Sequence, residues 1–256
     1  MDASAWIRRV IVSSCLFCCL TLHVHAQQVS DFSLPAPKTV GSQKLQLWAT
    51  WYHLFPAKED KKGLPLRDTK NQPISLRIPA KEWCLGAMSG AINITAKNGQ
   101  RKTYNYIDSK GPLQVDCRKY VRNGKAWVAA IGHSRFKVSD GAYGDGFDKN
   151  VLIPYRTIAV DKRRIPLGSV LFVPSARGNK IILPNGKTAV HDGYFYVGDK
   201  GGGAVKQNHV DVFSGPIVAN PFPSFIKHSP KETFSAFIIH DKKVLAKLFA
   251  SHQKRS

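Results

Sequence analysis

The sequence predicts a mainly β protein that ends in a helix, and three features carry this prediction. Short runs of β-branched and aromatic residues alternate with clusters of glycine, proline, asparagine and aspartate, as in strands joined by turns. An Asn-Gly pair and a Pro-Asn-Gly triplet between such runs predict hairpins. Near the end of the chain, residues 242–250 carry apolar side chains at helical spacing, which predicts an amphipathic helix.

The first 26 residues have the pattern of a secretory signal peptide. Arg8 and Arg9 precede the apolar run 10–22, and a small-residue pattern predicts cleavage after Ala26. The run is shorter than the roughly 20 apolar residues that span a bilayer, which argues against a membrane anchor. We therefore expect an exported protein, with a lipoprotein anchored at Cys15 as the alternative.

Export decides how the cysteines are interpreted. Without the signal peptide, two of the five cysteines remain, Cys84 and Cys117. An even pair in an oxidising compartment predicts one disulfide, and two buried free thiols are the alternative. The bond would close a loop of about 30 residues, worth on the order of 3 to 4 kcal/mol in the chain-entropy model.

The chain is strongly basic, with 38 Lys and Arg against 17 Asp and Glu and a formal net charge of +21. Such a surface attracts polyanions. Because the sequence has no helix-turn-helix, RNP or zinc-finger pattern, we expect no nucleic-acid partner. Anionic polymers of a cell envelope fit the exported compartment, and a basic surface that serves only solubility stays open.

The mature chain is expected to be one domain with an insertion. Residues 27–43 are polar and contain proline, which predicts a flexible arm. The domain itself is expected to span 44–250, with the insertion at about 57–145, and 251–256 form a basic tail. We expect a monomer.

Within the insertion, residues 73–79 and 127–131 are short apolar runs that predict strands. A helical turn is expected from Ala80. Residues 89–99 and 101–108 meet at an Asn-Gly pair and predict a hairpin.

Outside the insertion, a second hairpin is expected at 178–187, and further strands are expected at 45–54, 158–160, 169–173, 194–197 and around Asp211. The strand at 194–197 is expected to end at Gly198 and Asp199. Val210 and Val212 flank Asp211, so this strand should bury the valines and present the carboxylate on its other face.

Two segments together resemble a known family. AVDKRRIPLGSVLFVP at 159–174 and GDKGGGAVKQNHVDVFSG at 198–215 resemble the bacterial three-aspartate (3D) domain, and LWATWYH at 47–53 resembles its first barrel strand. The resemblance implies a six-stranded double-psi β-barrel, here with a disulfide-stapled β-rich insertion and a C-terminal helix. The sequence departs from the family in the 12-position spacing between Asp199 and Asp211, which is one residue longer than expected.

The 3D domain is shared with membrane-bound lytic transglycosylases, so the resemblance also implies an activity. Such an enzyme cleaves the bond between N-acetylmuramic acid and N-acetylglucosamine in peptidoglycan and leaves 1,6-anhydro ends, as part of cell-wall turnover. By matching positions, Asp211 is the acid and base, and Asp199 and Asp161 support it. The compartment would be the periplasm or the outer membrane.

Further residues are candidates for binding the glycan. Trp51 and Tyr52 offer aromatic faces for sugar stacking. The other candidates are Lys206, Tyr143, Gly202 and Gly203. No cofactor and no metal ion is expected.

Several alternatives stay open at this stage. A non-catalytic cell-wall-binding module of expansin type would use a similar barrel, and a basic envelope interaction protein would need no catalysis. A calcium loop at Asp140, Asp145 and Asp148 lacks the final glutamate of an EF-hand. A zinc set around His191 and His209 lacks a readable fourth ligand.

Overall fold

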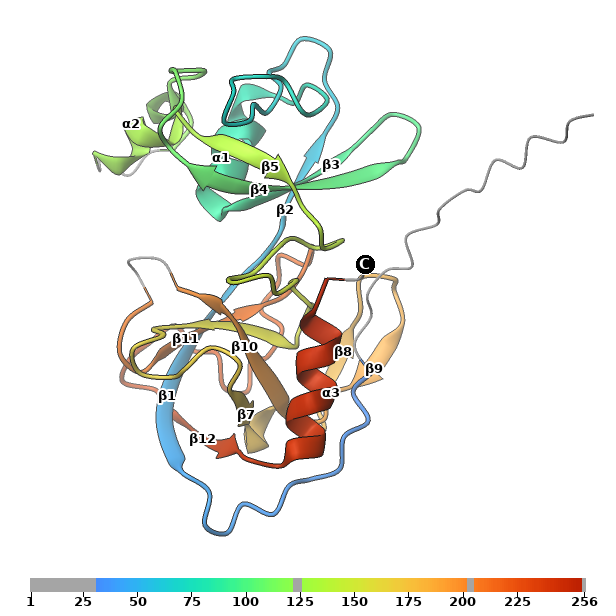
Figure 1. Ribbon diagram of the computed structural model, residues 1–256, viewed down its shortest axis with the longest axis vertical. Helices are drawn as coiled ribbons and strands as arrows, with labels where there is room; N and C mark the ends of the chain where they lie inside the picture. Colours follow the sequence, from blue (N-terminus) through green and yellow to red (C-terminus); the bar gives the residue numbers. More distant parts are fainter. Residues whose placement is uncertain (1–30, 122–125, 202–204, 255–256) are drawn as a thin grey trace, which may run out of the picture.

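The computed structural model describes residues 31–121, 126–201 and 205–254, so the expected signal peptide lies outside the described residues. The described chain forms two lobes stacked along the long axis of the molecule (Figure 1). We call them the barrel lobe, residues 31–54 and 147–254, and the insertion lobe, residues 55–146. In the described ranges, no helix is long and apolar enough to cross a membrane.

The barrel lobe is built on a closed barrel of six strands in the order β1-β11-β6-β10-β7-β12, which confirms the predicted fold class. The strands are β1 (Lys44–Tyr52), β6 (Thr157–Val160), β7 (Val170–Phe172), β10 (Tyr194–Lys200), β11 (His209–Phe213) and β12 (Phe234–Ile239). β1 pairs with β11 and β6 with β10 in parallel, and the other four pairs are antiparallel. Alternate residues such as Leu47, Ile158, Phe195 and Val210 fill the interior.

The helix α3 (Lys242–His252) covers one outer face of this barrel, as predicted for the C-terminal segment. The Asp241 side chain caps its start by accepting hydrogen bonds from two backbone amides. At its end the His252 ring stacks on Tyr196, with 4.1 Å between the ring centroids. A short hairpin of β8 (Lys180–Ile182) and β9 (Thr188–Val190) adjoins the barrel where the Pro-Asn-Gly triplet predicted it.

The insertion lobe has a sheet in the order β2-β3-β4-β5 and its own hydrophobic core, which includes Trp83, Ile92 and Phe136. Its elements are β2 (Phe55–Lys58), α1 (Ala80–Ser89), β3 (Ala91–Thr95), β4 (Arg101–Asp108), η1 (Cys117–Lys119), α2 (Trp127–Ile131) and β5 (Arg135–Val138). The predicted disulfide Cys84–Cys117 is present and ties α1 to η1.

Two strands expected in the insertion do not form. Residues 127–131 are the helix α2, in which Val128 and Ile131, three positions apart, are buried together. A five-residue apolar run does not distinguish a strand from a helix turn. Residues 73–79 have only isolated bridges, Leu64 with Ile78 and Arg67 with Pro73.

Residues 31–34, within the segment predicted as a flexible arm, contact the barrel. The buried Arg156 guanidinium pairs with the Asp192 carboxylate at 2.7 Å and also donates to the backbone oxygen of Asp31. Asp192 in turn accepts from the backbone amide of Leu34. The ring of Phe32 lies 4.4 Å from the same guanidinium. A buried ion pair therefore holds the start of the described chain in place.

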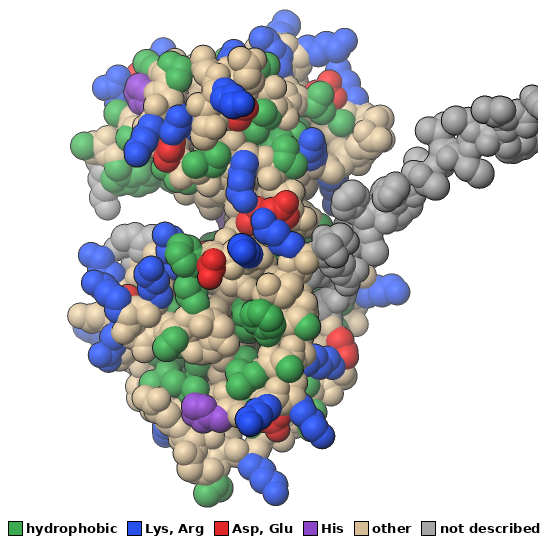
Figure 2. All heavy atoms as spheres, viewed as in Figure 1, with side chains coloured by type: hydrophobic (Ala, Val, Ile, Leu, Met, Phe, Trp, Pro, Cys, Tyr) green, Lys and Arg blue, Asp and Glu red, His purple; other side chains and the backbone are tan. Residues whose placement is uncertain are grey.

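Lysine and arginine side chains are spread over both lobes on the face seen in Figure 2, and the molecule is hollowed between the lobes. β1, β10 and β11 rise toward this junction (Figure 1). A cluster of Leu54, Ala91, Tyr143, Leu152 and Phe213 joins the lobes across it.

Candidate active site

The barrel's strand register places two of the three aspartates in one row. Asp211 on β11 and Asp199 on β10 are both paired with Ala159 on the intervening strand β6. Residues in one row across a sheet point to the same face. Because Val210 and Val212 point into the barrel core, this row faces outward. The two carboxylates therefore lie two strand spacings apart, on either side of a single methyl group.

Asp211 is held by a chain of polar groups that starts on β1. The Thr50 hydroxyl donates to Asp211 Oδ1 at 2.7 Å, and Thr50 Oγ1 lies 2.8 Å from His209 Nε2. Since the hydroxyl proton is given to Asp211, His209 Nε2 must carry the proton that Thr50 accepts. The Trp48 ring stacks on His209 at 3.7 Å and fixes its orientation. This chain orients Asp211 from one side and leaves the carboxylate half-buried.

Asp199 is held by different groups. The Tyr52 hydroxyl donates to Asp199 Oδ2 at 2.9 Å, and the backbone amide of Lys200 donates to Oδ1 at 2.8 Å. The sequence predicted that β10 ends at Gly198 and Asp199. The strand instead continues to Lys200, with a shift of register between Val197 and Asp199. This irregularity puts Asp199, rather than Gly198, opposite Ala159.

Burial raises the pKa of both carboxyl groups to about 6. For Asp199 the Tyr52 and Lys200 hydrogen bonds oppose this rise, while the charge of Asp211 adds to it. For Asp211 the Thr50 hydrogen bond opposes it. A carboxyl group with such a pKa is protonated in about a tenth of molecules at pH 7, so it can both give and take a proton.

Asp161 directly follows β6 and, unlike Asp199 and Asp211, is paired with an arginine. Its carboxylate forms an ion pair with Arg163 at 2.7 Å and accepts from the backbone amide of Gln207 at 3.4 Å. The hydrogen bonds from Arg163 hold its pKa well below the usual range. Asp161 is therefore ionised at neutral pH, and it anchors the segment that leads into β11.

Of the residues predicted to bind the glycan, some lie near the two carboxylates and others lie elsewhere in the molecule. Tyr52 contacts Asp199, and Lys206 is exposed next to Gln207. Trp51 lies on the other face of β1, packs against the barrel core, and donates its ring N–H to the Val218 carbonyl. Tyr143 is buried in the cluster between the lobes. Gly202 and Gly203 lie outside the described residues.

Three further residues belong to this site: Trp48 and Thr50, which were not predicted as site residues, and His209, which was considered only as a zinc ligand. All three share the face of Asp211, since Thr50 is paired with Asp211 and Trp48 with His209 in the parallel β1–β11 ladder. The sequence signal is their even spacing, two residues apart on each strand.

The described residues contain no group of three or more His, Cys, Asp or Glu that would hold a metal ion. His191 instead lies in the barrel lobe's core, where its Nε2 contacts the Tyr155 carbonyl at 2.8 Å and its ring stacks on Phe195. Burial lowers its pKa to about 3, so the ring is neutral.

Comparisons with known proteins find solved structures that are similar to this one at low identity. Solved structures similar to this one include E. coli MltA with bound chitohexaose, with 14% identity, a TM-score of 0.47, and coverage of 75% of this chain and 71% of that chain. A membrane-bound lytic murein transglycosylase from Agrobacterium tumefaciens has 13% identity, a TM-score of 0.44, and coverage of 80% and 78%. The lytic transglycosylase LtgG of Burkholderia pseudomallei has 15% identity, a TM-score of 0.36, and coverage of 76% and 71%.

The comparison with curated proteins gives no match. The family model of the 3D domain matches residues 156–217, a range that runs from the start of β6 past the end of β11. It includes Asp161, Asp199 and Asp211. The chain thus carries a 3D domain at residues 156–217, within a barrel whose first strand lies outside that range.

Proposed function

We propose that this protein is a lytic transglycosylase that cleaves the glycan strands of peptidoglycan at the bond between N-acetylmuramic acid and N-acetylglucosamine. The observation that supports this most is a half-buried Asp211 with its pKa raised to about 6, oriented by Thr50 on the outer face of a 3D-domain barrel. The match to the 3D domain, which is shared with lytic transglycosylases, supports peptidoglycan as the substrate class.

In this reaction Asp211 first donates its proton to the glycosidic oxygen, and the bond from that oxygen to the muramyl anomeric carbon breaks. The resulting carboxylate then removes the proton of the muramyl 6-hydroxyl. The freed oxygen electron pair attacks the anomeric carbon and closes a 1,6-anhydro ring. Asp211 ends protonated again, and no water is consumed.

The neighbouring groups have supporting roles in this proposal. Thr50 and His209 keep one oxygen of Asp211 fixed, so the other faces the scissile bond. The negative charge of Asp199 stabilises positive charge that develops on the sugar ring in the transition state. Tyr52 keeps Asp199 in place for this role. Asp161 positions the segment before β11.

We further propose that the protein acts after export, in the periplasm or at the outer membrane, in cell-wall turnover. The segment 1–26 and the disulfide Cys84–Cys117 support an oxidising compartment.

Digestion of purified sacculi tests the activity, with mass spectrometry of the soluble products. The proposal expects 1,6-anhydromuropeptides from the unchanged protein and from the control Asp148→Asn, in which an exposed aspartate that is not part of the row is changed. Asp211→Asn should release none. If the protein sediments with sacculi and no products appear, it is a binding module of the expansin type rather than an enzyme.

A further inference from the structure

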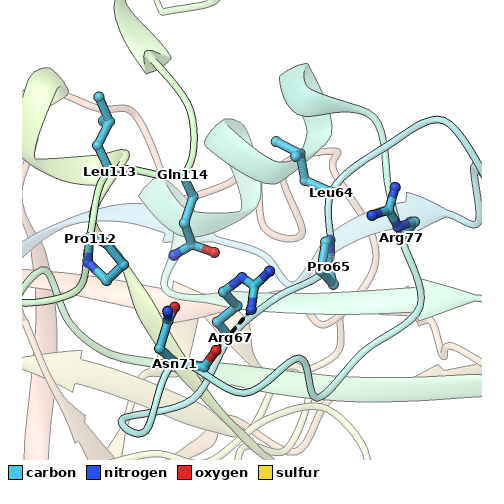
Figure 3. A pocket seen from close by; sticks show the side chains of 8 residues that line it. All are labelled: Leu64, Pro65, Arg67, Asn71, Arg77, Pro112, Leu113 and Gln114. Atoms are coloured by element: carbon cyan, nitrogen blue, oxygen red, sulfur yellow. Dashed lines mark hydrogen bonds between the residues drawn. The ribbon is translucent and has the colours of Figure 1, made fainter.

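The insertion lobe contains a pocket of about 310 Å³, formed by the segments 64–77 and 112–114. Figure 3 shows Arg67 and Gln114 pointing toward one another at its centre, with Leu113 and Leu64 on either side of Gln114. The volume is at the lower end of the range for small-ligand sites. All of its lining residues belong to the insertion lobe, whereas Asp199 and Asp211 lie on the barrel.

Two guanidinium groups give the pocket a positive charge. Arg67 donates one N–H to the Asn71 carbonyl at 2.8 Å, and Arg77 donates one to the Gly63 carbonyl at 3.2 Å. Within the described part of the chain, neither forms an ion pair with a carboxylate. Because a guanidinium has five N–H donors, both retain donors for an anionic ligand.

Gln114 adds an acceptor to these donors. Its Nε2 donates to the Ser134 carbonyl at 2.9 Å, which fixes the amide so that Oε1 faces the side of Arg67 (Figure 3). Oε1 is buried and has no hydrogen-bond partner among the described residues. A buried acceptor without a donor is unfavourable, so a ligand N–H that reaches it after a small movement of Arg67 would bind favourably.

Hydrogen bonds hold the backbone of the pocket wall in place. The backbones of Leu64 and Ile78 exchange two hydrogen bonds, of 2.8 and 2.9 Å. The Arg67 carbonyl accepts from the backbone amide of Phe136, and the Pro65 carbonyl accepts from the ring N–H of Trp83. These bonds tie the wall to β5 and α1, so ordering the loop adds little to the cost of binding.

We propose that this pocket binds the carboxyl terminus of a short peptide. The terminal carboxylate is held by Arg67 and Arg77, and the N–H of the last residue donates to Gln114 Oε1. A small aliphatic side chain contacts Leu64 and Leu113, the second of which is 60% exposed. The site is separate from the proposed catalytic row and does not depend on glycan cleavage.

NMR titration of the leucine methyl groups tests this, with the mature, disulfide-bonded protein. The probes are N-acetyl-D-alanine and N-acetyl-L-alanine, with acetate and inorganic phosphate as comparisons. We expect saturable shifts at Leu64 and Leu113 with at least one N-acetylalanine, and binding at least about tenfold weaker for acetate and phosphate.

Arg67→Met and Arg77→Met should each weaken N-acetylalanine binding at least about tenfold, since each removes a charge-assisted contact. Arg164→Met, an exposed arginine on the barrel lobe, should leave it unchanged. Retained spectra of the variants show that they fold. Equal affinity for phosphate and N-acetylalanine, binding that survives both substitutions, or no saturable shift would each overturn the proposal.

Discussion

At the scale of single residues, the burial that suits Asp211 to acid–base catalysis also makes its ionised form unfavourable for folding. Burial raises its pKa from 3.8 to about 6, so the folded protein holds a proton that the unfolded chain releases between these values. The contribution of this group to stability is therefore complete below pH 4 and is lost as the pH rises through 6. The raised pKa that lets Asp211 act as an acid therefore means that its ionised form lowers the stability of the fold at neutral pH.

The first prediction follows from this sign. Asp211→Asn keeps the shape and the Thr50 contact but removes the buried charge. We expect it to raise the free energy of unfolding by about 1–2 kcal/mol at pH 7, reduced from the full pKa effect because the group is partly solvated, and by almost nothing at pH 4. Urea denaturation at both pH values measures this. An Asn variant that is less stable than the parent at pH 7 would contradict it, and Asp148→Asn is the control.

A second prediction concerns Thr50, whose hydrogen bond lowers the Asp211 pKa. Thr50→Val removes the hydroxyl at nearly constant volume, so the pKa of Asp211 should rise further and the activity optimum should move to higher pH. Thr50→Ser retains the donor and should behave like the parent. Titration of the ¹³C carboxyl signal of Asp211 follows this directly, and an unchanged midpoint in Thr50→Val would refute the proposed hydrogen-bond chain.

At the scale of elements, the start of the described chain depends on one buried ion pair. Arg156 and Asp192 are both almost completely inaccessible, and Leu34 and Asp31 are bonded to them. Arg156→Met leaves the Asp192 carboxylate buried without its partner, which should cost about 3–5 kcal/mol. The double variant Arg156→Met with Asp192→Asn should recover part of this loss. Denaturant unfolding checks both, and equal stabilities of the single and double variants would disprove the coupling.

The strands and helices also show how much of the structure could be predicted from the sequence. Alternation along β11 correctly predicted buried Val210 and Val212 and an outward Asp211. It did not reveal that Thr50, rather than Trp51, is paired with Asp211, because the register of a parallel ladder between distant strands leaves no local signal. β12 was not predicted. It pairs with β1 and β7, which are distant in the sequence, so its neighbours in the chain do not indicate this pairing. α2 was mistaken for a strand because its five residues are too few to show a period.

At the scale of the whole molecule, the two lobes have separate cores, and the disulfide Cys84–Cys117 lies within one of them. It closes 33 positions of chain, which the chain-entropy model values at about 4 kcal/mol. Replacing both cysteines by serine should therefore destabilise the insertion lobe more than the barrel lobe. Calorimetry should show one transition shifted to lower temperature and one nearly unchanged. A single transition that shifts as a whole would show that the lobes unfold together.

The central claim is that Asp211 breaks the glycosidic bond and closes the anhydro ring without water. Digestion of peptidoglycan in H₂¹⁸O, followed by mass spectrometry of the muramyl ends, tests this most directly. The account predicts 1,6-anhydro ends with no ¹⁸O, and none of these ends with Asp211→Asn. Reducing ends that carry ¹⁸O would identify hydrolysis instead, and anhydro ends that persist in Asp211→Asn would show that another residue is the acid and base.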